Sequence, residues 1–218
     1  QENSLQKINS KFEIFNIPVD LEVDHDFIGN RIITEIEALP LRLNIRNDSN
    51  YDNEKIFGHL DISVINKNKK INYILKNNSL KFMTDNNEIV GDINIKPFFI
   101  SSNLNLQNIG LKGFLDNNSV LINLIKSEIL NNKNLNGKIS VILDGLYDLR
   151  HVDKIKFDIQ LEEGLIFISN LNFVFKNSVE FNFNNVSVIV DDNKLKFIGD
   201  VILDFKDIQN FYNHFQII

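Results

Sequence analysis

Apolar and polar residues alternate with a period of two through the stretch from Ile155 to Phe205. Because successive side chains of a β-strand point to opposite faces of the sheet, this alternation predicts strands with one apolar and one polar face. Gly, Asn and Asp interrupt it roughly every 8–12 residues, and these residue types tolerate the backbone angles of tight turns. The stretch therefore predicts an antiparallel meander of about five strands. The residues expected on its apolar face are Phe157, Ile159, Ile166, Ile168, Phe173, Phe175, Phe181, Phe183, Val188, Val190, Phe197 and Phe205.

The same alternation runs through residues 5–107, where short polar turns join the expected strands. Strands do not alternate with long helices there, so we expect no parallel sheet with covering helices. The predicted fold class is all-β: a long antiparallel meander that forms a curved, groove-like sheet. We expect an N-terminal block of strands over 1–108 and a C-terminal block over 109–218, and the two blocks can also form one continuous sheet.

Two short amphipathic helices are expected beside the strands. Over about 119–131 the apolar residues follow the three-and-four spacing of a helix with one apolar side. Over 207–216, Ile208, Phe211 and Phe215 show the same spacing. We expect the first helix to lie over one end of a sheet and to separate the two blocks, and the second to pack against the preceding strands.

Charge and composition exclude several classes of partner and site. The formal net charge is −6 and the lysines are scattered, whereas nucleic-acid binding needs clustered Lys and Arg, so no nucleic-acid partner is expected. The chain has no cysteine, which excludes disulfides and thiolate metal sites. No apolar run approaches the ~20 residues of a membrane-spanning helix. Because the chain lacks an initiator Met, we expect a segment of a longer protein, with any anchor or targeting signal outside it.

Three stretches carry the residue types of catalytic or metal sites. Alternation turns His25 away from its acidic neighbours, whereas metal ligands must converge, so residues 24–26 are not expected to bind a metal. They are interpreted as a loop. Residues 162–164 place two glutamates and a glycine in a tight turn. A glycosidase needs a second carboxylate across a cleft, and the sequence identifies none. Residues 191–193 lack the spaced acidic ligands of a calcium loop and are interpreted as a β-turn. We expect no metal, no cofactor and no enzymatic activity.

The apolar faces are the remaining place to look for a function, because the chain has eighteen phenylalanines and no Trp. One interpretation is a sheet curled into a trough whose apolar face holds acyl chains. The other is an ordinary sandwich core, in which the same rings meet a second sheet. Periodicity alone does not separate these two interpretations.

Motifs in the C-terminal third resemble a known family. They are the run QLEEGLI at 160–166, the segment 186–201 with its Gly-Asp pair, and the ending DFKDIQNFYNHFQ at 204–216. In this order they are similar to the AsmA-like C-terminal region of bacterial envelope proteins, a superfamily with AsmA, YhdP and TamB types. The similarity is greatest to versions from AT-rich alphaproteobacteria and covers about residues 115–216.

The resemblance implies a fold, a location and a role. Members of the family are periplasmic proteins anchored in the inner membrane, with long, twisted β-sheets and an apolar groove. They are implicated in moving phospholipid towards the outer membrane and in envelope integrity. For this chain the resemblance implies phospholipid acyl chains as the partner of the apolar face, attachment to the inner membrane through an anchor outside the chain, and no catalytic residues. Protein partners stay unknown.

Two other function classes remain open. One is a structural periplasmic scaffold with a closed, dry core and no ligand. The other is a carbohydrate-active enzyme on a β scaffold, which needs two facing carboxylates and aromatic platforms, and the lack of Trp speaks against it. An exposed apolar trough larger than roughly several hundred Å² would favour lipid binding over both.

Overall fold

The computed structural model describes residues 5–14, 17–64, 67–112, 122, 125, 132–149, 151–191 and 194–215. The chain divides into two compact units, unit 1 (Gln1–Pro97) and unit 2 (Phe98–Ile218). Strands make up most of both, which confirms the predicted all-β class. The division into blocks at residues 108 and 109 stays a prediction.

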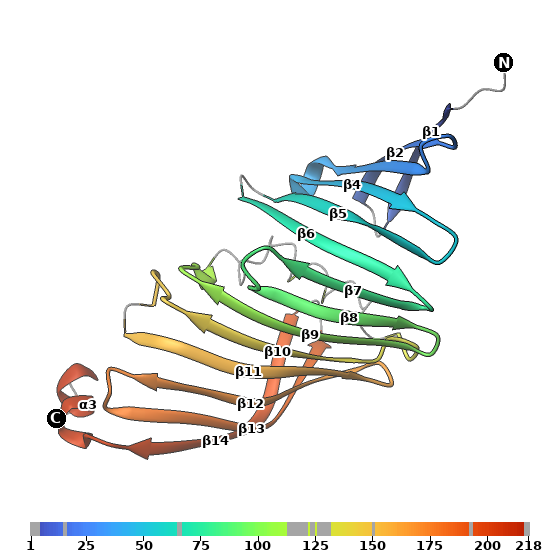
Figure 1. Cartoon of the computed structure of the whole chain (residues 1–218). Helices are drawn as coiled ribbons and strands as arrows, with labels where there is room; N and C mark the ends of the chain where they lie inside the picture. The colour runs from blue at the N-terminus through green and yellow to red at the C-terminus, as the bar shows by residue number, and fades with distance from the viewer. Residues whose placement is uncertain are drawn as a thin grey trace. The chain divides into compact units, whose positions relative to one another are not determined.

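The described part of unit 1 consists of eight strands, and each pairs antiparallel with the next along the chain (Figure 1). Short turns join them; Asn77 and Asn78, for example, have φ of 51° and 63°, the positive values that a two-residue type I′ hairpin requires. One 3-10 turn, η1 (Leu39–Leu41), separates the third and fourth strands. The strands are β1 (Leu5–Ile14), β2 (Ile17–Asp26), β3 (Arg31–Ala38), β4 (Leu43–Tyr51), β5 (Lys55–Val64), β6 (Lys67–Lys76), β7 (Ser79–Thr84) and β8 (Ile89–Ile95).

The described part of unit 2 contains six strands and, at its C-terminal end, the helix α3 (Ile208–Phe215), which confirms the helix predicted over 207–216 (Figure 1). From β10 onward each strand pairs antiparallel with the next. Glu163 and Gly164 form the turn between β11 and β12, both with positive φ. The strands are β9 (Phe98–Gln107), β10 (Gly137–Asp144), β11 (Val152–Glu162), β12 (Leu165–Phe175), β13 (Val179–Asp191) and β14 (Lys194–Phe205).

One strand pair departs from the predicted meander, because β9 and β10 run parallel. A parallel pair needs a crossover of roughly a dozen residues or more, and the segment 108–136 supplies it. The helix predicted over 119–131 belongs to this crossover. Apart from Ile122 and Ile125, which are both helical, it lies outside the described residues.

The core of unit 2 lies between the sheet and the segments that cross over it. Val141 and Leu143 of β10 are buried together with Leu146 and Val152, and Ile109 and Leu111 from the crossover pack against them. A second cluster joins three buried residues of β11, β12 and β13 to Ile125 and Leu135 of the crossover. Its buried residues are Leu161, Ile166 and Val188.

Candidate functional site

One face of unit 1 carries two apolar rows, with Asn47, Ser49 and Tyr73 between them. In an antiparallel pair, residues that lie directly opposite share a face of the sheet. The residues that define this unit 1 apolar face are Leu21, Ile36, Ile45 and Ile62, aligned across β2 to β5, and Ile56, Leu75, Leu80 and Ile93, aligned across β5 to β8. The opposite face is mixed: it carries Ile33, Phe57 and Ile74 together with cross-strand ion pairs such as Arg46–Glu35 and Lys76–Glu54.

No described element of unit 1 forms a second layer over this face. The only helical residues described in unit 1 are the three of η1. Val19 and Ala38 are its only buried apolar residues among those described, and all eight residues of the unit 1 apolar face are half-buried. An apolar sheet face normally packs against another element, and no described element of unit 1 supplies one.

Unit 2 places all twelve residues predicted for the apolar face on one side of β11 to β14. The register aligns Ile166, Val188 and Phe197 in one row and Phe175 and Phe205 in another, with Val179 between them. Phe173 lies opposite Phe181, Ile159 opposite Ile168, Phe157 opposite Val141, Phe183 opposite Val201, and Val190 opposite Leu195. Register shifts in β12 and β13 near Asn170 and Asn185, both with positive φ, keep the apolar residues on this side. Their contact with lipid stays a prediction.

The unit 2 face is covered at one end and open at the other. Phe157, Ile159, Phe173 and Phe175 pack against the buried cluster under the crossover. On β14, by contrast, Phe197 is 61% exposed, and Val201, Leu203 and Phe205 are exposed beside it. A closed core and an open apolar surface therefore exist side by side, and the open part lies over β14. Val201 and Leu203 were not among the predicted residues, although the same alternation marks them.

The stretches that carry acidic and histidine residues have structural roles. The loop predicted at residues 24–26 is wrong, because these residues belong to β2 and pair with β3. His25 Nε2 lies 2.9 Å from the Tyr51 hydroxyl, and its ring lies against Phe27. Glu163 is a hairpin turn residue. Asp191 ends β13 and pairs with Lys196, while the rest of 191–193 lies outside the described residues. Within the part of the chain that the structure describes, no three His, Cys, Asp or Glu side chains gather to hold a metal ion.

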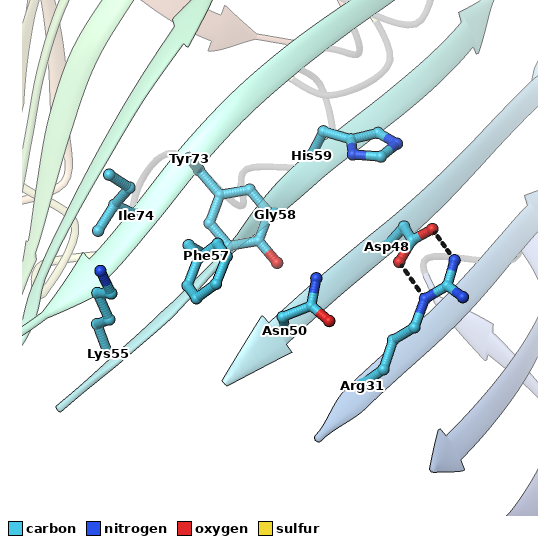
Figure 2. A pocket seen from close by; sticks show the side chains of 9 residues that line it. All are labelled: Arg31, Asp48, Asn50, Lys55, Phe57, Gly58, His59, Tyr73 and Ile74. Carbon is cyan, nitrogen blue, oxygen red and sulfur yellow. Dashed lines mark hydrogen bonds and ion pairs between the residues drawn. The ribbon is translucent and has the colours of Figure 1, made fainter. Parts of the chain in front are cut away.

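A polar depression of about 560 Å³ lies over β3 to β6 (Figure 2). The Arg31 guanidinium donates two hydrogen bonds to the Asp48 carboxylate, at 2.8 and 2.5 Å. These bonds hold the pKa of Asp48 below its usual range. His59 Nε2 is 3.4 Å from Asp61, on the same strand. Within the depression Arg31 and Asp48 therefore pair with each other, and the Lys55 ammonium lies over the Phe57 ring.

Asp48→Asn is expected to lower the free energy of unfolding by about 1 kcal/mol at pH 7. The effect is modest because Arg31 is half-exposed and solvent screens the ion pair. Because the folded pKa of Asp48 lies below the unfolded one, its contribution is present above about pH 4 and is lost as the pH falls through the folded value. Urea unfolding at pH 7 and at about pH 2 checks this. Asp20→Asn, in the more exposed pair with Lys11, is the control with a smaller effect. An equal loss for Asp48→Asn at both pH values would contradict the ion-pair explanation.

Comparison with known proteins finds no match: no family model, no curated protein and no solved structure is similar to this chain. Among the described helices, none has the length and apolar character needed to cross a membrane.

Proposed function

We propose that this chain shields lipid acyl chains on its apolar sheet faces, as a non-enzymatic segment of a bacterial envelope protein. The observation that carries the proposal is a sheet with an apolar face that no described element of unit 1 covers, together with the exposed apolar residues of β14 in unit 2. A chain that keeps such surfaces in water needs something apolar to lie on them.

The mechanism is passive. Acyl chains lie against the Phe, Ile, Leu and Val side chains, and each Å² of apolar surface removed from water contributes roughly 25 cal/mol. Charged side chains such as Arg46 and Lys76 lie on the opposite face. Lys69, the register partner of Ile62, lies on the apolar face, and its ammonium pairs with Glu88. Selectivity between head groups is therefore expected to be weak.

The location and the partners follow from the resemblance to the AsmA-like region. In this proposal the parent protein is periplasmic, anchored in the inner membrane by a segment outside this chain, and supports phospholipid transport between the inner and outer membranes. Outer-membrane integrity then depends on it.

A structural scaffold without a ligand is the second candidate, and the closed core of unit 2 favours it. Leu143, Leu161 and Val188 are buried under or beside the crossover, as in an ordinary domain. In that case the exposed residues of β14 contact protein instead of lipid.

Photo-crosslinking from two neighbouring positions distinguishes these candidates. Phe197 and Ile198 are similarly exposed, at 61% and 56%, but their register partners Val188 and Ser187 place them on opposite faces of β14. A benzophenone amino acid replaces either residue in the 218-residue chain. The protein is then irradiated with vesicles of phosphatidylethanolamine and phosphatidylglycerol, and adducts are identified by mass spectrometry.

Phospholipid adducts are expected at position 197 and not at position 198. Ile198 is the matched control, because a membrane surface that binds any exposed apolar residue labels both positions equally. Equal labelling, or no lipid adduct at position 197, would overturn the lipid proposal and leave the scaffold as the better account.

A further inference from the structure

The strand β14 forms a free edge of the unit 2 sheet. Among the described strands it pairs only with β13, and Figure 1 shows it outermost, next to β13. All residues over 196–205 are exposed, so no described segment covers the strand. After β14 the chain turns into α3, whose Phe211 ring contacts Phe205, and it adds no further strand beside β14 within the described residues.

A free edge presents backbone N–H and C=O groups that a further strand can bind. Proteins usually protect such an edge by keeping the strand short or by placing a proline or a bulge in it. The strand β14 has 12 residues and no proline. The register shift of its pairing adds the extra residue to β13, between Asn184 and Ser187, so β14 itself is uninterrupted. Its edge is therefore a template for another strand.

The charges of β14 favour one kind of partner. Lys196 lies near the start of the strand, whereas Asp200 and Asp204 lie towards its end, and all three share one face because their positions differ by even numbers. Lys196 pairs with Asp191, and both side chains are about half-exposed, so this pair exchanges partners at little cost. Among the described residues, no cation pairs with Asp200 or Asp204.

A second copy of β14 complements these charges when it runs antiparallel. The start of each strand then lies beside the end of the other. In a register centred on Ile198, Gly199 or Asp200, Lys196 lies opposite or diagonal to a carboxylate of the second copy, and both arrangements are within reach of a long side chain. A parallel second copy would instead place like charges side by side.

The apolar residues of β14 fit the same arrangement. In those three registers Phe197 lies opposite Gly199, Val201 or Leu203 of the second copy, all on the apolar face. Phe197, Val201 and Leu203 are 61%, 51% and 43% exposed in the single chain. Antiparallel pairing therefore brings apolar residues beside apolar residues while it brings opposite charges together on the other face.

We propose that β14 pairs antiparallel with β14 of a second copy of this chain, so that one sheet continues through a symmetric dimer. Such a contact uses the same surface on both copies and closes after two. The proposal concerns the backbone edge of β14, and it holds whether lipid or protein lies on the apolar face.

Charge exchange tests the pairing. Sedimentation equilibrium of the 218-residue chain over about 1–100 µM is expected to show a monomer and a dimer. Lys196→Glu makes the charged face of the strand acidic, and the double variant Asp200→Lys/Asp204→Lys makes it basic. Each alone is expected to raise the dimer dissociation constant on the order of tenfold, because two symmetric contacts change from attraction to repulsion. An equimolar mixture of the two variants is expected to dimerise at least as tightly as the wild type.

Lys154→Glu is the matched control. It breaks an ion pair with Asp144, on β11 and β10, whose exposure is similar to that of the pair formed by Lys196. Its dissociation constant is expected to equal that of the wild type. A monomer throughout the concentration range, species that grow beyond a dimer, or no recovery in the mixture would overturn the proposal.

Pulsed electron paramagnetic resonance tests the direction of the strands. Because the chain has no cysteine, Ile198→Cys and Lys206→Cys each carry a single nitroxide label per copy. Around a two-fold axis the separation of equivalent positions grows by about 7 Å for each residue away from the centre. We expect less than about 15 Å between labels at position 198 and more than about 35 Å at position 206. Short separations at both positions would indicate parallel strands and overturn the proposal. Lipid adducts at position 197 are measured separately, so failure of dimerisation and failure of lipid binding are distinguishable.

Discussion

Leu161→Ala is expected to lower the free energy of unfolding by about 2–5 kcal/mol. Leu161 is 5% exposed and belongs to the buried cluster with Ile166 and Val188, beneath Ile125 and Leu135 of the crossover. Truncation removes the transfer free energy of three carbon atoms and leaves a cavity, because a sheet and a crossover segment that meet around the side chain collapse only partly.

Leu165→Ala is the matched control for this prediction. Leu165 follows Leu161 across the same hairpin but is 56% exposed, so its truncation should cost less than about 0.5 kcal/mol. Urea unfolding followed by circular dichroism measures both variants. The slope of the free energy of unfolding against urea concentration is expected to stay constant, because only stability changes. Similar losses for the two leucines would show that the crossover does not close a core over β11 to β13.

Gly58→Ala is expected to lower the free energy of unfolding by about 1–3 kcal/mol, although alanine adds a single carbon. A Cβ at position 58 would lie 2.2 Å from the Asp48 carbonyl oxygen and 2.7 Å from Ser49 Cα. Both are backbone atoms of the neighbouring strand, so the strands themselves must separate. Tyr73, the register partner of Gly58 on β6, reaches Asn47 on β4 with its hydroxyl at 2.6 Å, and Figure 2 shows its ring beside Gly58.

Ser63→Ala on the same strand is the control for the glycine substitution. It removes an exposed hydrogen bond to Asn68 and should cost less than about 0.5 kcal/mol. Thermal unfolding of both variants compares them directly. A Gly58→Ala protein as stable as Ser63→Ala would mean that β4 and β5 tolerate a side chain at their closest approach.

The alternation of residue types was sufficient to predict strands, because burial on one face of a sheet demands a period of two. It also located a turn: Glu163 and Gly164, predicted to lie in a tight turn, both have positive φ. Among the eleven described non-glycine residues with positive φ, eight are asparagines, a residue type that tolerates this conformation. The helix α3 was likewise predictable from its three-and-four spacing.

Cross-strand partners were not predictable from the alternation. β9 and β10 pair parallel because the segment 108–136 crosses over between them. The alternation within each strand does not say in which direction the next strand runs. The polar cluster of His151, Lys176 and His214 joins residues from three separate parts of the chain. No spacing rule connects such residues, because only the register of β11 to β14 and the docking of α3 bring them together.

The sequence by itself determined which side chains share a face, since that follows from the geometry of a single strand. Only the tertiary structure decided which part of each face is closed. Phe157 and Phe197 carry the same alternation signal, yet Phe157 packs under the crossover and Phe197 is 61% exposed. The physical reason is that burial depends on a second segment distant in sequence, and the periodicity of one strand carries no information about what lies above it.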